Sequence, residues 1–139
     1  MKILVCISSV PDTTAKINFT PDNKEFVAAG VTFILNPYDE IALSKAVDLA
    51  TANNGTVTVI NVGDPSTDAV IRKALAIGAT DAVRINAIPR DSFFVAKQIA
   101  DYAKKNSDEL KNINLYVKPE DGKAYYTANN GKINGDVDL

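Results

Sequence analysis

Short apolar runs alternate with amphipathic stretches along residues 1–105, and this alternation limits the possible folds more than any other feature of the chain. The runs at 3–7, 57–62 and 82–85 have the length and composition of buried strands. Segments that follow them, at 37–52, 66–77 and 92–105, repeat apolar residues at helical spacing. Because strand–helix–strand units connect with a right-handed crossover, we expect an α/β fold in three layers, with helices on both faces of a parallel sheet.

The first two helices are predicted to begin with the same pattern, a capping residue followed by proline. Asn36 can cap the first of them and Pro37 suits its first turn, while Asp64 and Pro65 repeat this arrangement at the second. Gly55 follows two asparagines at the end of the first helix and is expected to adopt the left-handed conformation of a helix C-terminus.

Two regions depart from the alternation. Residues 8–35 predict an irregular excursion with a short hairpin around the turn at 21–23. Residues 107–139 are polar; they predict a hairpin from strands at 113–117 and 123–127, followed by loop. We therefore assign residues 1–106 to the α/β domain and leave 107–139 as a separate tail. We expect the domain to be incomplete, because the tail lacks the further buried strand that such a sheet requires.

Composition excludes several classes of function. The net charge of −2 arises from 15 basic and 17 acidic residues without clustering, so no nucleic-acid partner is expected. There is no histidine, which removes histidine-based catalysis and metal sites. A single cysteine, Cys6, favours a reducing compartment, and we expect a cytoplasmic protein with Cys6 as a small core residue. No apolar run is long enough for membrane insertion.

Ligands of parallel α/β sheets bind beyond the carboxyl ends of the strands. The segments that leave those ends here contain neither a dinucleotide-binding nor a Walker glycine pattern. Gly63 stands before a helix start and is explained either by a tight turn or by ligand contact. The stretch from Asn36 to Asp39 is explained either by ordinary helix capping or by contact with the polar edge of a base. In the tail, Gly131 fits the central glycine of a calcium loop, but Tyr126 and Ala128 then occupy ligand positions, so we reject calcium.

Four sequence blocks indicate a family. In order and approximate spacing, the chain resembles electron transfer flavoprotein beta subunits and their FixA-type relatives. The resemblance covers residues 1–105 and is carried by MKILVCI at 1–7, VPDT at 10–13, NPYDEIAL at 36–43 and RKALAIGATDA at 72–82.

The resemblance implies an adenine-nucleotide-hydrolase-like fold and a heterodimer with an alpha subunit. Such a complex carries electrons from flavin dehydrogenases to a quinone-reducing acceptor, so no catalytic activity of the chain's own is expected. The redox-active FAD lies mainly on the alpha subunit, and the beta subunit holds AMP or a second FAD. The implied nucleotide contacts are Cys6 (through its backbone), Asn36, Pro37, Tyr38, Asp39, Val62 and Gly63.

The sequence also departs from the family. Residues 107–139 contain no buried strand followed by a Gly-Lys or Gly-Arg loop and an acidic segment that would wrap the phosphates. We therefore expect AMP to bind the chain alone only weakly or not at all, with a Kd above about 100 μM. Two alternatives stay open: a small universal-stress-type nucleotide-binding module, and a soluble enzyme that uses the strand ends, although no nucleophile–base pair is visible.

Overall fold

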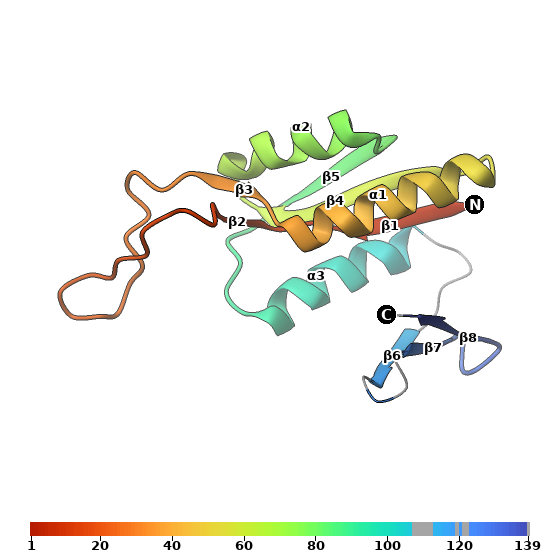
Figure 1. Ribbon diagram of the computed structural model, residues 1–139. Helices are drawn as coiled ribbons and strands as arrows, with labels where there is room; N and C mark the ends of the chain where they lie inside the picture. The colour runs from red at the N-terminus through yellow and green to blue at the C-terminus, as the bar shows by residue number, and fades with distance from the viewer. Residues whose placement is uncertain (107–112, 119, 121–122, 139) are drawn as a thin grey trace. The chain divides into compact units, whose positions relative to one another are not determined.

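The chain folds into two compact units, Met1–Asp91 and Ser92–Leu139 (Figure 1). The computed structural model describes residues 1–106, 113–118, 120 and 123–138. The division falls immediately before the third predicted helix, α3 (Ser92–Lys105). That helix therefore groups with the C-terminal strands and not with the preceding strand–helix–strand units.

The first unit is a parallel three-stranded sheet with two helices, which confirms the predicted α/β class. Its sheet has the order β1-β4-β5, and Lys2 pairs with Thr56 while Thr58 pairs with Asp81. A 3₁₀ turn precedes the second helix, so that helix begins slightly later than the sequence pattern predicts. The elements are β1 (Lys2–Cys6), α1 (Pro37–Ala52), β4 (Thr56–Gly63), η1 (Pro65–Thr67), α2 (Asp68–Ile77) and β5 (Asp81–Asn86).

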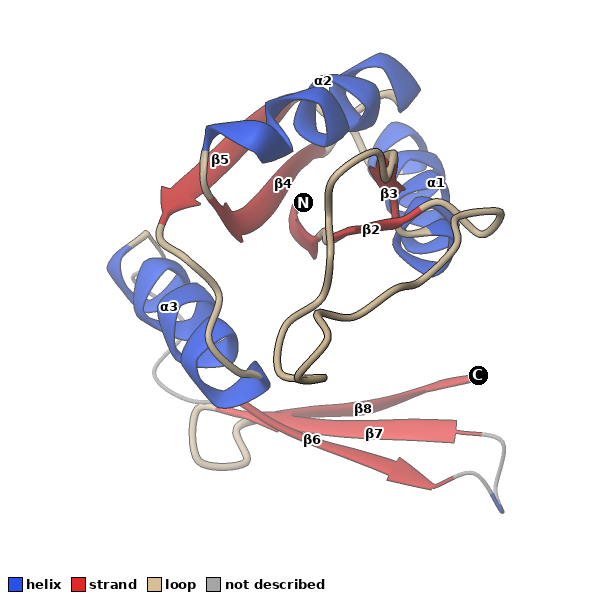
Figure 2. Cartoon of the chain, turned by 90° about the vertical axis from the view of Figure 1, so that its left-hand side faces the viewer, coloured by secondary structure: helices blue, strands red, loops and turns tan. Residues whose placement is uncertain are grey.

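Helices α1 and α2 cover the same face of this sheet (Figure 2). The strand order advances in one direction through both crossovers, so two right-handed connections place both helices on one side. Together they enclose one apolar core. Its buried members are Val5, Ile7, Leu35, Leu43, Ala46, Ala50, Val57, Val59, Val70, Ile71, Ala74 and Ala79.

The prediction of Cys6 as a core residue is wrong. Val5 is buried under the helices, and successive side chains of a strand point to opposite faces, so Leu4 and Cys6 face away from α1 and α2. Cys6 is accordingly exposed, and Leu4 is 36% exposed. An apolar run alone does not indicate which of its residues face the helices.

Residues 8–35 form the predicted excursion. Its ends pair as an antiparallel ribbon of β2 (Ser9–Pro11) and β3 (Phe33–Leu35). An isolated antiparallel bridge between Phe19 and Phe26 closes the predicted hairpin. The Phe26 ring packs edge-to-face against the Phe19 and Phe33 rings, with centroid distances of 6.5 and 6.4 Å. This aromatic row gives an otherwise polar excursion its own apolar contacts.

The prediction for Gly55 is also wrong. Asn54, with φ of 48°, takes the left-handed conformation after α1, while Gly55 does not. Glycine is needed at position 55 for a different reason. A Cβ atom there would lie 2.4 Å from the Met1 carbonyl oxygen, which accepts a hydrogen bond from the Thr56 N–H at 2.9 Å. Close approach of two backbone segments, and not helix termination, therefore requires this glycine.

The second unit contains α3 and an antiparallel sheet of order β6-β7-β8. The pairing of β6 (Ile113–Lys118) with β7 (Lys123–Ala128) confirms the predicted hairpin. The prediction of loop after this hairpin is wrong, because β8 (Ile133–Asp138) pairs with β7 along its whole length. The turn between them is formed by Asn129, Asn130 and Gly131, with φ values of 54°, 58° and 83°. Asparagine and glycine tolerate this conformation, so their abundance marks a turn and not an unstructured end.

Candidate functional site

The carboxyl ends of β1 and β4 lie side by side in the parallel sheet. Cys6 is paired with Ile60, and the ladder continues one step further, where the Ile7 N–H donates to the Ile60 carbonyl at 2.9 Å. Val62 and Gly63 complete β4 immediately beyond this point. Three of the predicted site residues, Cys6, Val62 and Gly63, therefore meet at one edge of the sheet.

Ser8 connects the start of α1 to the same edge. Its backbone N–H and its Oγ donate to the Asp39 Oδ2 at 2.8 and 2.6 Å. Asn36 donates from Nδ2 to the Ser8 Oγ at 3.3 Å and from its backbone N–H to the Ser8 carbonyl at 3.1 Å. The Asn36 Oδ1 accepts from the Tyr38 N–H at 3.1 Å, so Asn36 caps the helix as predicted. Asn36 and Asp39 thus face the end of β1.

Pro37 and Tyr38 play different parts from their neighbours. Pro37 occupies the first position of α1, where its missing N–H leaves no hydrogen bond unmade. Tyr38 is 81% exposed, and none of its side-chain atoms has a partner among the described residues. Of the four residues from 36 to 39, only Asn36 and Asp39 are therefore fixed against the sheet edge through their side chains.

Asn61 is a site residue that sequence reasoning missed. Its side chain is buried, with 3% exposure, and its Nδ2 donates to the Ile7 carbonyl at 2.9 Å. Its Oδ1 has no hydrogen-bond partner among the described residues, which is rare for a buried acceptor. The available signal was one polar residue inside the apolar run at 57–62. Ser8 was also missed, because its contacts join positions 28 and 31 residues apart.

Gly63 is explained by close packing in the turn after β4. A Cβ atom at this position would lie 2.6 Å from Thr67 Cγ2 and 2.9 Å from Asn61 Oδ1. Both distances are shorter than any ordinary contact, so any larger residue would have to displace the side chains of Thr67 and Asn61. Close packing therefore accounts for a glycine at position 63, and its contact with a ligand stays a prediction.

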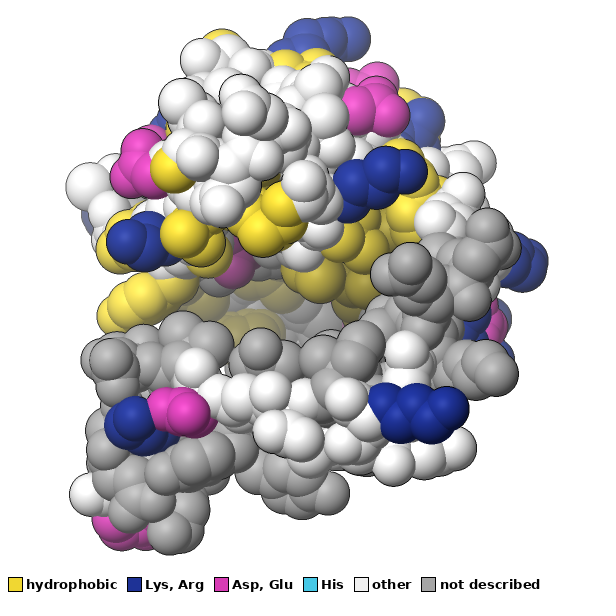
Figure 3. All heavy atoms as spheres, turned by 90° about the vertical axis from the view of Figure 1, so that its right-hand side faces the viewer, with side chains coloured by type: hydrophobic (Ala, Val, Ile, Leu, Met, Phe, Trp, Pro, Cys, Tyr) yellow, Lys and Arg dark blue, Asp and Glu magenta, His cyan; other side chains and the backbone are white. Residues whose placement is uncertain are grey.

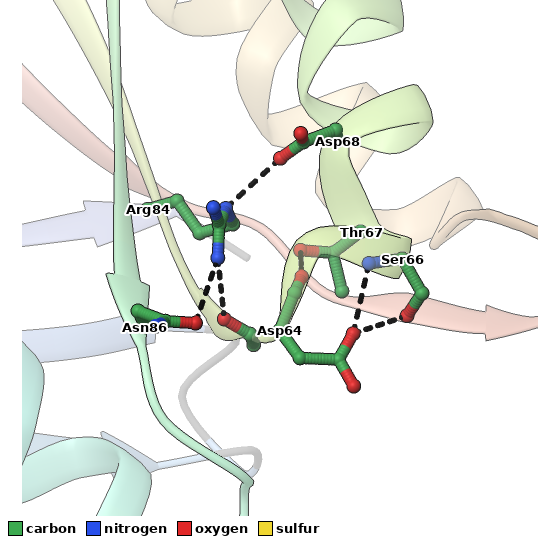
Figure 4. Close-up of polar contacts among 7 residues, drawn as sticks. Asp64, Ser66, Thr67, Asp68, Arg84 and Asn86 are labelled. Carbon is green, nitrogen blue, oxygen red and sulfur yellow. Dashed lines mark hydrogen bonds and ion pairs between the residues drawn. The ribbon is translucent and has the colours of Figure 1, made fainter.

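The N-terminal end of the second helix is closed by its own residues (Figure 4). The Asp64 carboxylate accepts hydrogen bonds from the N–H and hydroxyl of Ser66, and the Asp64 carbonyl accepts from the Thr67 N–H and hydroxyl. The Ser66 hydroxyl, followed by the Ser66 N–H, lowers the pKa of Asp64. The Asp64 carboxylate and carbonyl already occupy these donors, and the carboxylate repels a second anion. This turn therefore does not form a phosphate site.

Arg84 joins the ends of β4, β5 and α2. Its Nη1 donates to the Gly63 carbonyl at 3.3 Å and to the Asn86 Oδ1 at 3.0 Å, and its Nε lies 2.9 Å from the Asp68 carboxylate (Figure 4). Because Asp68 already neutralises this guanidinium, Arg84 acts as a clamp between elements and is not free to bind phosphate.

The Cys6 thiol does not have the properties of a reactive cysteine. Partial burial of the sulfur, followed by the nearby Asp39 carboxylate, raises its pKa, although the residue as a whole is exposed. The thiol is therefore protonated at neutral pH, and the thiolate that nucleophilic chemistry needs is scarce.

Three further features of the described residues bear on ligand binding. In the view of Figure 3, Lys and Arg side chains lie singly among polar and hydrophobic ones and form no continuous basic patch. A hollow of about 510 Å³ lies within the excursion, lined by residues of 12–18 and 27–32, and contains none of the predicted site residues. Within the described ranges no group of three acidic, histidine or cysteine side chains could hold a metal, and no helix is long and apolar enough to cross a bilayer.

The fold and this sheet edge define a parallel, Rossmann-like α/β unit in which the ends of two strands meet the start of a helix. A family model described as "Electron transfer flavoprotein domain" matches residues 24–115, more than half of the chain. The chain belongs to the electron transfer flavoprotein domain family.

Its relatives include beta-type subunits. Protein FixA of Azorhizobium caulinodans is 43% identical over 94 residues, which cover 68% of this chain and 32% of the relative. The electron transfer flavoprotein subunit beta of Thermoanaerobacterium thermosaccharolyticum is 40% identical over 82 residues, or 59% and 31% of the two chains. The acryloyl-CoA reductase electron transfer subunit gamma of Anaerotignum propionicum is 36% identical over 87 residues, or 63% and 32%. The chain thus spans about a third of the length of these relatives.

A second family model matches residues 92–139 and is described as "Family of unknown function (DUF6465)". Its bounds coincide with those of the second unit, Ser92–Leu139. Residues 92–115, which include α3, fall within both matches. The two matches therefore follow the structural division. The first unit is matched by the flavoprotein family model alone. The antiparallel sheet lies wholly within the second match, and only its residues 113–115 also fall within the first.

Proposed function

We propose that this chain is a beta-type component of an electron transfer flavoprotein, and that its first unit receives the base and ribose of an adenine nucleotide. The observation that carries the proposal is the position of Ser8. By bonding to both Asn36 and Asp39, Ser8 brings the start of α1 to the ends of β1 and β4. Family-matching residues from three distant stretches thereby meet at the edge where open α/β sheets bind ligands.

The donors and charges at this edge fit a nucleoside better than a phosphate. Tyr38 N–H and Ser66 N–H are occupied by the caps of their own helices, and the Asp39 and Asp64 carboxylates contribute negative charge. The backbone groups of Ile7 and Ser8 are bonded within the unit, so the neutral groups that these residues and Asn36 leave to a ligand are the second Nδ2 hydrogen of Asn36 and the second lone pairs of the Ile7 and Ser8 carbonyls. The phosphates of AMP, or of a second FAD, would then be held by groups outside the first unit. This division supports the expectation of weak binding by the chain alone.

A partner would complete the electron carrier. We assign this role to an electron transfer flavoprotein alpha subunit, which would hold the main redox-active FAD and supply the flavin chemistry when that group is bound. The complex would accept electrons from flavin dehydrogenases and deliver them to a quinone-reducing acceptor. This role is supported by the relatives, which include an electron transfer flavoprotein subunit beta and the electron transfer subunit gamma of an acryloyl-CoA reductase. This chain's own residues would position the second nucleotide and perform no bond-making step.

Titration of the whole chain with adenosine, AMP and FAD tests the nucleotide site. We expect the Kd values of adenosine and AMP to exceed about 100 μM and to agree within about threefold, because no phosphate contact is made. In NMR spectra, adenosine should shift the amide signals of Gly63 and Cys6, while those of Gly30 and Gly131 serve as internal controls. An AMP Kd below about 100 μM, or shifts confined to Gly30 or Gly131, would contradict the proposal.

Co-expression tests the partner. A tagged electron transfer flavoprotein alpha subunit should retain this chain through purification and show flavin absorbance, while the chain expressed alone should remain colourless. If the alpha subunit is recovered with flavin but without this chain, the proposed pairing is wrong even where the nucleotide titration succeeds.

A further inference from the structure

We propose that Asn61 is a specificity-determining residue of the nucleotide site, and that its Oδ1 accepts a hydrogen bond from the 6-amino group of an adenine base. This role rests on the proposed function. Asn61 lies where β1 and β4 part. Their pairing ends at Cys6 and Ile60, one further backbone bond joins the Ile7 N–H to the Ile60 carbonyl, and β4 then continues to Gly63 without β1 beside it. Ligands of open α/β sheets bind beyond such strand ends.

The amide of Asn61 is held in one orientation. Its Nδ2 donates to the Ile7 carbonyl at 2.9 Å, at the place where a continued parallel ladder would bring the Val62 N–H. Because the nitrogen is bonded to this carbonyl, the amide cannot turn over, and Oδ1 is left as an acceptor only. Asn61 alternates along β4 with Val57 and Val59, so its side chain lies on the face of the sheet that α1 and α2 cover. Its surroundings therefore belong to the first unit.

Oδ1 of Asn61 lacks a donor. It is buried without a partner among the described residues, and leaving a buried acceptor unpaired destabilises a fold. The Thr67 hydroxyl lies near it, because a Cβ atom at Gly63 would be 2.9 Å from Oδ1 and 3.0 Å from the Thr67 Oγ1. The single hydrogen of that hydroxyl is already donated to the Asp64 carbonyl at 2.9 Å. We therefore expect the donor to come from a bound molecule.

The surroundings of Oδ1 favour an uncharged N–H donor. The Asn61 side chain is buried, and a charged group would lose its hydration there. The 6-amino group of adenine offers N–H donors at the edge of a flat, largely apolar ring. Hypoxanthine and guanine carry a carbonyl oxygen at the same position of the ring, and this oxygen would face Oδ1 with no hydrogen between them. Asn61 therefore favours an aminopurine over an oxopurine.

Gly63 keeps the approach to Oδ1 free of side-chain atoms. A Cβ atom at this position would lie 2.9 Å from the oxygen. Because Oδ1 is buried, we expect a base to reach it when the turn that follows Gly63 moves aside. The hydrogen bonds between Asp64 and Ser66 lie within that turn, so it can shift as one piece without breaking them (Figure 4).

Titration of the whole chain with a set of nucleosides, followed by NMR, tests this role without any change in the protein. Adenosine, inosine and purine riboside share the ribose and differ at position 6 of the base, which carries an amino group, a carbonyl oxygen or hydrogen. We expect the Kd of adenosine to be about fivefold below that of purine riboside, which lacks the donor. It should be at least about tenfold below that of inosine, whose carbonyl opposes Oδ1. Adenosine should also shift the side-chain NH₂ signals of Asn61.

Variants assign the selectivity to Asn61. Asn61→Leu has a similar shape and no polar atom, and we expect its Kd values for these nucleosides to agree within about twofold. A loosened fold would weaken the binding of all of them alike, so the ratios of the Kd values report the contact itself. Asn86→Leu, at the end of β5, is the matched control and should keep the wild-type ratios. Far-UV circular dichroism checks that each variant is folded.

Two outcomes would overturn this role and leave the proposed function standing. One is that the wild-type Kd values of the nucleosides agree within about twofold, which would show that Oδ1 makes no contact with the base. The other is that the wild-type ratios survive in Asn61→Leu. Failure of adenosine to bind at about 10 mM would contradict the proposed function and this role together.

Discussion

A capping residue followed by proline introduces both α1 and the η1 turn before α2, yet the two starts are fixed in different ways. At α1, Asn36 caps Tyr38, and the Asp39 carboxylate reaches the Ser8 backbone, 31 positions away in the sequence. At the second start, the Asp64 carboxylate bonds only within its own turn, to Ser66. The ion pair between Asp68 and Arg84 connects the N-terminus of α2 to β5 of the sheet. The N-terminus of α1 is thus held by half-buried hydrogen bonds, and that of α2 by a more exposed ion pair.

This difference bears on how firmly each helix start is held against the sheet. A start that is bonded to the backbone of a neighbouring strand holds its position at any salt concentration, because short, partly buried hydrogen bonds are little screened. A start that depends on a partly exposed ion pair is held less firmly. The predictions below test this contrast, in order of decreasing effect.

Replacing Asp39 should have the largest effect. Asp39→Ala leaves the Ser8 N–H without its acceptor, and we expect the free energy of unfolding of the first unit to fall by about 2 kcal/mol. Urea unfolding followed by circular dichroism measures the loss, and hydrogen exchange in residues 37–52 assigns it to α1. The control is Asp48→Ala, an exposed acidic residue of the same helix. A loss within about 0.5 kcal/mol of that control would show that the Ser8 contact contributes little.

Removing the cap of α1 should have the next largest effect. Asn36→Ala deletes the acceptor of the Tyr38 N–H and should cost about 1 kcal/mol in the same unfolding assay. Asn36→Asp keeps the capping oxygen but loses the Nδ2 donor to Ser8, so it should recover part of the stability. If both variants lose equal stability, the capping hydrogen bond contributes nothing to the free energy of unfolding, and the whole loss comes from the Nδ2 contact with Ser8.

The clamp at α2 should be weaker and sensitive to salt. We expect Arg84→Met to lower the free energy of unfolding by about 0.5 kcal/mol at low ionic strength, because both partners are partly exposed. The loss should shrink when the salt concentration rises to about 1 M, where screening is strong. Lys73→Met, which breaks the exposed ion pair with Glu40, serves as the matched control. A loss at Arg84 that is independent of salt would assign the effect to its bonds with Gly63 and Asn86.

The smallest effect should be the pH dependence contributed by Asp64. Ser66 lowers the folded-state pKa of Asp64 below its ordinary value of 3.8. A lowered carboxylate pKa stabilises the folded state above pH 3.8, and this contribution is lost as the pH falls below 3.8 through the folded value. The melting temperature of wild type should therefore exceed that of Asp64→Asn at pH 6, and the difference should narrow at pH about 3. A constant difference would show that the carboxylate charge is not involved.

Local sequence rules predicted much of the first unit. The caps at Asn36 and Asp64 and the apolar runs gave the strands and helices, because these features depend on neighbours along the chain. The same rules could not reveal Ser8, whose importance comes from distant partners. They also placed Cys6 in the core, because an apolar run alone does not indicate which of its two alternating sets of side chains packs against the helices. The final strand was missed because the asparagines that form its turn resemble an unstructured end.

The candidate site was predicted less completely. Family resemblance supplied Asn36, Asp39 and Val62, while the buried Asn61 needed the structure, since one polar residue in a strand carries no family signature. Residue types alone left two explanations open for Gly63. The short distances to Thr67 and Asn61 explain the glycine by packing, and its contact with a ligand stays a prediction.

The one-directional strand order has a consequence for how the first unit assembles during synthesis. Each strand of the order β1-β4-β5 pairs with the strand made just before it in this sheet, so no strand waits for a partner synthesised much later. Chains emerge from the ribosome N-terminus first. A nascent chain that has released residues 1–63 already holds β1, α1 and β4, and can close half of its core before α2 exists. Partial protection of β1 from proteases on stalled ribosomes should therefore appear at that length and become complete once β5 has emerged.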